Sequence, residues 1–234
     1  MEKTEWITSI QKEAIKRKSW HQLNSSPLMA RLMGADEMAL RALFVGYWPF
    51  VDSFPRVIQR TYEESAQFSR YGRVLSGALR EMETDERNHR ALWLRSTTAA
   101  NIPEADLYAS EPLLEVVRIT GAMVERDALW QRLLDFVAVE IVAEGLSVAL
   151  LSSDRFCERL GAKGMAWFKV HALHPSDETT HEEIAYRAAV ALMPKNGAES
   201  VLDQVERTVQ ETVNRFVDAM SACFRAQDAL EAVY

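Results

Sequence analysis

The chain has 234 residues, which is long enough to bury a substantial core, so we expect a single domain over residues 1–234. Hydrophobic residues make up 48% and charged residues 26%, with a net charge of -7, a composition typical of a soluble, mildly acidic globular protein. This balance argues against a nucleic-acid partner, because phosphate binding needs a basic surface. No apolar run approaches the roughly 20 residues of a membrane span, and Met1 to Lys18 lacks the apolar core of a secretory signal. We therefore expect a cytoplasmic protein with no membrane partner.

Helical periodicity runs along most of the chain, whereas alternating strand patterns are hard to find. No proline interrupts residues 56–102 or 113–174, so long helices can form there. Ser26 before Pro27 resembles a helix cap, and 101–112 is the longest candidate loop. The sequence predicts an all-α, single-domain bundle of seven or eight helices. We expect helices at about 3–22, 36–69 with a break or kink near Pro49 and Pro55, 71–98, 112–124, 126–151, 153–174, 175–193 and 198–232.

Two titratable residues fall on the apolar face of the helix predicted at 71–98. That face begins at Leu75 and continues in register through Glu86 and His89 to Trp93. Residues three apart on a helix are neighbours, so Glu86 and His89 are placed to bind the same ion.

The helix predicted at 126–151 is apolar almost all round, yet it carries Glu140 and Glu144. Glu144 continues the apolar stripe that passes through Leu133 and Ile141. A buried carboxylate needs a partner or a metal, so Glu144 is a candidate ligand. Glu140 lies one turn earlier, roughly 40° round the helix, and is a reserve candidate.

A third group of titratable residues surrounds Pro175, where a helix must kink or restart. If one helix continues through this point, three imidazoles and a carboxylate share a face: His171, His174, Glu178 and His181. Asp177 lies at the edge of that face. Four of the five histidines of the chain thus fall on inward stripes together with carboxylates. This concentration predicts a metal site.

Imidazole and carboxylate ligands without thiolate suit iron, manganese or zinc, and such a set inside a helical bundle suits two metal ions best. Two divalent ions bring +4, and three of the candidate carboxylates bring -3. The third metal-ligating acid, after Glu86 and Glu144, is either Asp177 or Glu178, and His171 is open between a ligand and a supporting residue. The predicted ligand set is Glu86, His89, Glu144, His174, Asp177, Glu178 and His181.

The spacing of these residues resembles that of the haem-oxygenase-like di-iron oxidases and oxygenases, which share a fold with thiaminase II and pyrroloquinoline quinone synthase. Glu144 follows His89 by 55 residues, and His174-x-x-x-Glu178-x-x-His181 has the spacing of the family's last motif. The segment 26–34 is similar to the second helix of that fold. Two features depart from the pattern: the family has Asp at the position of Glu178, and some members place the first carboxylate at the position of Met82.

The resemblance implies a non-haem di-iron oxidoreductase that binds two Fe²⁺ ions, with Mn or Zn as substitutes. It would activate dioxygen to oxidise a small organic substrate, either fatty-acid-like or amino-acid-like. The fold analogy implies a homodimer. The catalytic residues would be Glu86, His89, Glu144, His174 and His181. The pocket is expected to be walled by Tyr47, Phe50, Phe54, Trp93 and Ile141.

Other functions of the same fold are alternatives. The chain could be a cofactor-free protein like pyrroloquinoline quinone synthase, a thiaminase-II-like hydrolase, or a binding protein without catalysis. The hydrolase needs a nucleophilic cysteine on the helix that carries Glu144, and Cys157 lies beyond that helix. Haem binding needs a histidine on the first helix, for which His21 is the candidate.

Overall fold

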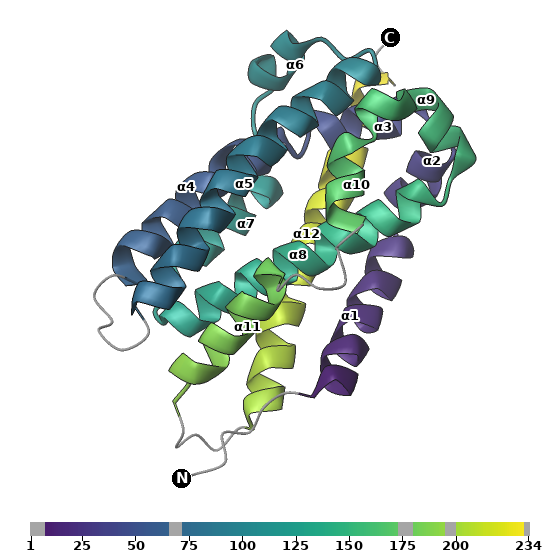
Figure 1. Cartoon of the computed structure of the whole chain (residues 1–234). Coiled ribbons are helices and arrows are strands. Elements are labelled where there is room, and N and C mark those ends of the chain that lie inside the picture. Colours follow the sequence, from purple (N-terminus) through teal and green to yellow (C-terminus); the bar gives the residue numbers. More distant parts are fainter. Residues whose placement is uncertain (1–7, 66–71, 173–179, 195–199, 232–234) are drawn as a thin grey trace.

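The computed structural model describes residues 8–65, 72–172, 180–194 and 200–231, and all regular elements within these ranges are α-helices (Figure 1). This confirms the all-α prediction. In chain order the helices are α1 (Ser9–Asn24), α2 (Pro27–Met33), α3 (Glu37–Phe44), α4 (Trp48–Ser65), α5 (Gly72–Ala99), α6 (Glu104–Ala109), α7 (Leu114–Val124), α8 (Leu129–Leu151), α9 (Asp154–Gly164), α10 (Ala166–Ala172), α11 (His181–Leu192) and α12 (Val201–Glu231).

The described part of the chain therefore holds twelve helices, more than the seven or eight predicted. The predicted helix at 36–69 is divided into α3 and α4, and the one at 153–174 into α9 and α10. Pro49 lies in the first turn of α4, where a missing backbone N–H leaves no hydrogen bond unmade, whereas Pro55 stays inside the helix. Within α9, the backbone of Gly161 has φ 62°, a conformation that glycine adopts without a Cβ clash.

The two short helices α2 and α6 account for the remaining difference. Ser26 caps α2, its side chain accepting a hydrogen bond from the backbone N–H of Met29, with Pro27 as the first helical residue. This confirms the predicted cap. The prediction of a continuous loop at 101–112 is wrong, because helix α6 forms in the middle of this segment, directly after Pro103.

Helix α8 crosses the middle of the molecule and contacts α1, α10, α11 and α12 (Figure 1). Sixteen of its 23 residues are buried, as expected of a helix that is apolar on all sides. Even so, none of the helices that the structure describes is both long and apolar enough to cross a membrane.

Helix α5 buries the stripe that its sequence predicts. Leu75, Leu79, Met82 and Trp93 are 2–4% exposed. Glu86, in phase with them, is therefore carried into the interior at the face where α5 meets α10 and α11.

Helix α1 docks onto α8 at a glycine. A Cβ atom at Gly145 would lie 2.4 Å from the Trp20 ring, so a residue without a side chain is needed there. The Nε1–H of Trp20 donates to the carbonyl oxygen of Ile141, at 2.9 Å. This contact sets the position of α1 beside the part of α8 that carries Glu140 and Glu144.

Candidate metal site

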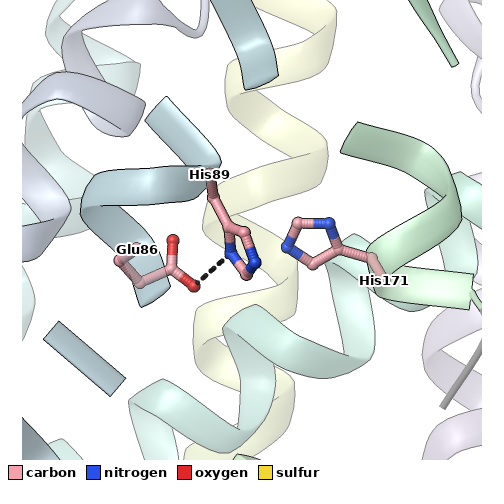
Figure 2. A group of neighbouring side chains, drawn as sticks. All are labelled: Glu86, His89 and His171. Atoms are coloured by element: carbon pink, nitrogen blue, oxygen red, sulfur yellow. Dashed lines mark hydrogen bonds and ion pairs between the residues drawn. The ribbon is translucent and has the colours of Figure 1, made fainter. Parts of the chain in front are cut away.

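Glu86, His89 and His171 form a group in which one ligand atom from each residue lies within 4.8 Å of the other two. Glu86 and His89 are one turn apart on α5, and Nδ1 of His89 lies 3.1 Å from Oε1 of Glu86. Figure 2 shows the imidazole of His89 between the carboxylate of Glu86 and the ring of His171. Two helices far apart in sequence thus bring three potential metal ligands together.

His171 comes from the last turn of α10 and is 4% exposed. Its Nδ1 lies 2.8 Å from the carbonyl oxygen of Trp167, and because a carbonyl only accepts, Nδ1 carries the proton. The neutral ring then has its lone pair on Nε2, the form that binds a metal. The ring also packs against Trp167 at 4.1 Å and His89 at 4.5 Å between centroids. These contacts hold the imidazole in one orientation.

Burial and charge oppose each other within the pair on α5. Burial acts to raise the pKa of Glu86, but the hydrogen bond from His89 and the nearby imidazoles outweigh it, so the pKa is lowered. For His89, burial acts to lower the pKa, and the hydrogen bond to Glu86 and its charge raise it overall. Without a metal, the two residues therefore favour an ion pair.

Glu140 of α8 lies beside this group. Burial raises its pKa well above the ordinary value for a glutamate, and the charges of Glu86 and Glu182 raise it further. His181, at the start of α11, has Nδ1 3.9 Å from Oε1 of Glu140 and Nε2 3.3 Å from Oδ2 of Asp85. Among the described residues, the carboxylates of Asp85, Glu86 and Glu140 thus lie near the imidazoles of His89 and His181.

The structure brings together part of the predicted ligand set. Glu86 and His89 meet as predicted, and His171, which the sequence leaves open, joins them. His181 contacts Glu140 and Asp85 at the edge of the group. Three further predicted ligands lie outside the described residues: His174, Asp177 and Glu178.

The predicted ligand Glu144 is not part of this group. It forms an ion pair with Lys16 of α1, and the two side chains are 15% and 19% exposed. The reserve candidate Glu140 is the α8 carboxylate that lines the cavity beside Glu86. The periodicity of α8 gave no sign of this difference, because residues on every face of the helix are buried.

Sequence reasoning missed Asp85 and Lys16. Asp85 precedes Glu86 and is half-exposed, so it does not follow the apolar stripe of α5. Lys16 lies one turn after Lys12, which pairs with Glu183. That four-residue spacing of two lysines on α1 is the signal that could have indicated a second charged contact with the bundle.

A cavity of about 60 Å³ adjoins the group. Among the predicted wall residues, Tyr47, Phe50, Phe54 and Trp93 line it, whereas Ile141 is fully buried elsewhere in the core. Ile141 lies on the stripe that includes Glu144, whereas the cavity faces another side of α8. The charged or imidazole side chains of the wall are Glu86, Glu140 and His171.

This arrangement offers oxygen and nitrogen donors in a buried place bordered by aromatic side chains. A carboxylate with two imidazoles is a donor set that suits iron, manganese or zinc. Thiol chemistry has no support at this point, because neither Cys157 nor Cys223 lines the cavity.

The sequence matches no protein-family model and no curated protein. Its structure is similar to that of a TenA homologue from Pseudomonas syringae, with a TM-score of 0.76 and 16% identity over 92% of each chain. It is also similar to a domain of unknown function with a haem-oxygenase-like fold from Shewanella denitrificans, with a TM-score of 0.72 and 12% identity over 96% of this chain and 95% of the other. The chain therefore has the haem-oxygenase-like fold.

Proposed function

We propose that the protein is an iron-dependent oxidoreductase that uses dioxygen to oxidise a small organic substrate. The observation that carries the proposal is the convergence of Glu86, His89 and His171 within 4.8 Å beside a buried cavity. The resemblance of the sequence to the di-iron oxidases supports the choice of metal.

The residues present fit a bound cation. Three donors from α5 and α10 are close enough to share one ion. Glu140 lines the same cavity outside this trio, and the raised pKa of this carboxyl, caused by burial and then by Glu86, is what a nearby cation would reverse. Iron bound there would supply the redox chemistry for which amino-acid side chains are poorly suited.

The chain's own residues prepare and shield the site. The carbonyl of Trp167 holds the proton on Nδ1 of His171, and Glu86 accepts a hydrogen bond from His89. Such contacts fix ligand orientation before an ion arrives. Aromatic side chains of the cavity, including Trp93 and Phe54, keep bulk water from the donors.

A second ion would draw on donors at the edge of the group. Glu140 and His181 lie there, 3.9 Å apart between Oε1 and Nδ1. His174 and one of Asp177 or Glu178 are predicted from the sequence to complete the set. We therefore expect two Fe²⁺ ions per chain.

Anaerobic titration with Fe²⁺ tests the proposal. The parent protein should bind close to two ions per chain, and the loaded protein should consume dioxygen when a reductant is supplied. His89→Ala, His171→Ala and His181→Ala should each lose at least one ion. His21→Ala is the matched control, because His21 is an exposed histidine at the end of α1. Absence of iron binding by the parent would overturn the proposal.

Hydrolysis is the second candidate function, and the similarity to a TenA homologue favours it. A thiaminase-II-like reaction requires a thiol nucleophile. Cys157 lies on α9 with its Sγ 3.5 Å from the carbonyl oxygen of Leu151, away from the cavity wall. Hydrolysis of thiamin by metal-free protein, lost in Cys157→Ser and retained in Cys223→Ser, would support this function over the oxidase.

A further inference from the structure

The cavity beside the donor group carries its polar groups at one end. On α8, Ala143 and Leu146 line the wall beyond Glu140, and Leu146 is about 9 Å further along the helix axis. On α5, Trp93 is about 10 Å from Glu86. Among the described residues, the rest of the wall consists of aliphatic and aromatic side chains.

The described part of the cavity wall has no cationic side chain of the kind that binds an anion. No lysine or arginine lines the cavity among the described residues. The hydroxyl of Tyr47 already donates to the carbonyl oxygen of Phe216, at 2.6 Å. Moving a carboxylate from water into such a place without a cation is strongly unfavourable, and the charge of Glu86 adds repulsion.

The volume limits the ligand. A water molecule needs about 10–15 Å³ of such space, so a cavity of about 60 Å³ has room for roughly four to six water-sized groups. Met29 and Met220 belong to the wall, and their flexible side chains allow modest adjustment. A molecule with an apolar body of about six heavy atoms is the size that follows.

We propose that the substrate is a short, predominantly apolar molecule recognised through its apolar body, and that an anionic end group enters the cavity only when metal is bound. The identification of this ligand as the substrate rests on the proposed function. The recognition itself depends on the wall: aromatic and aliphatic side chains bind the body, and the bound ions are the positive charge at the polar end.

Calorimetric titration with two probes of equal chain length tests this. Metal-free protein should bind hexan-1-ol at least tenfold more tightly than hexanoate. Loading with Zn²⁺, which is redox-inert, should strengthen hexanoate binding at least tenfold and change hexan-1-ol binding much less. Equal binding of the two probes by metal-free protein would overturn the inference.

Variants that fill part of the cavity test whether hexan-1-ol binds there. Ala143→Leu, which adds volume at the wall, should weaken hexan-1-ol binding at least tenfold, whereas Ala149→Leu, on the same helix but away from the wall, should not. Leu146→Phe narrows the cavity from the next turn and serves as the second filling variant if Ala143→Leu does not fold.

The two proposals fail separately. Normal iron uptake without hexan-1-ol binding would overturn the inference and leave the proposed function intact. Hexan-1-ol binding without any metal uptake would overturn the proposed function and confirm the apolar recognition by the wall.

Discussion

Lys16 of α1 and Glu144 of α8 form a largely buried ion pair, with side chains 19% and 15% exposed. One turn earlier on α8, Glu140 lines the cavity together with Glu86 and has no lysine or arginine partner among the described residues. Two glutamates of one helix therefore have opposite electrostatic surroundings.

This difference predicts opposite effects of removing each charge from metal-free protein. Burial raises the pKa of Glu140 in the folded protein. The ionised carboxylate therefore destabilises the fold, and this destabilisation is absent below the unfolded-state pKa of about 4.3 and grows as pH rises towards the folded-state pKa. Glu140→Gln should thus raise the free energy of unfolding at pH 7 by on the order of 1 kcal/mol, with little effect at pH 4. Denaturant unfolding at the two pH values measures this.

Glu144→Gln is the matched control. It leaves Lys16 without its partner and should lower the free energy of unfolding at pH 7. Fe²⁺ uptake should fall in Glu140→Gln and change less in Glu144→Gln. A destabilised Glu140→Gln with full iron uptake would contradict the role given to Glu140.

The pair of Glu86 and His89 predicts a pH window for metal-free stability. The His89 contribution is complete below its unfolded pKa of about 6.5 and is lost as pH rises through the raised folded value. The Glu86 contribution is present above about 4.3 and is lost as pH falls through the lowered folded value. Thermal unfolding of the parent and His89→Gln should differ by on the order of 1 kcal/mol between pH 5 and 6, and by less at pH 8.

Metal binding should show the opposite trend with pH. An imidazole must lose its proton to bind an ion, so Fe²⁺ affinity should rise from pH 6 to pH 8. Competition with a chelator of known affinity measures it. An affinity that is independent of pH would show that His89 is not a ligand.

The close packing of Trp20 against Gly145 predicts that a side chain at residue 145 lowers the stability of the protein. Gly145→Ala places a methyl group against Trp20 and should lower the free energy of unfolding by about 1–3 kcal/mol. Gly77→Ala, in the interior of α5 with no atom within 4 Å of the added Cβ, should instead raise it by about 0.5–1 kcal/mol. Thermal unfolding of both variants measures the contrast, and equal effects would show that α1 does not dock at Gly145.

Replacing Asp135 should cause a larger loss of stability. It is fully buried, accepts two hydrogen bonds of 3.0 Å from Arg126 and one of 2.6 Å from Thr212, and so links α8 to α12 and to the end of α7. Asp135→Asn should lower the free energy of unfolding by about 3 kcal/mol, because Arg126 keeps its buried charge. Glu211→Gln removes the exposed partner of the same arginine and should cost less than about 1 kcal/mol. Urea titration compares the two.

Much of the fold follows from local patterns. The apolar stripe from Leu75 to Trp93 carries Glu86 into the interior because an amphipathic helix has one favourable way to bury its apolar face. Prolines in first turns and the cap at Ser26 also mark helix starts, because they act on the backbone of the first helical turn alone. The short helix α6 escaped prediction because a six-residue segment carries too little periodicity to be distinguished from a loop.

The sequence by itself determined that the protein is an α-helical bundle and that Glu86 and His89 share an inward face. Tertiary structure decided the other partners: α10 brings His171 to this pair, and α1 pairs Lys16 with Glu144 while Glu140 lines the cavity. The physical reason is that α8 is apolar on every side, so its periodicity defines no unique inward face. Which of its carboxylates meets the cavity depends on which helices pack around it.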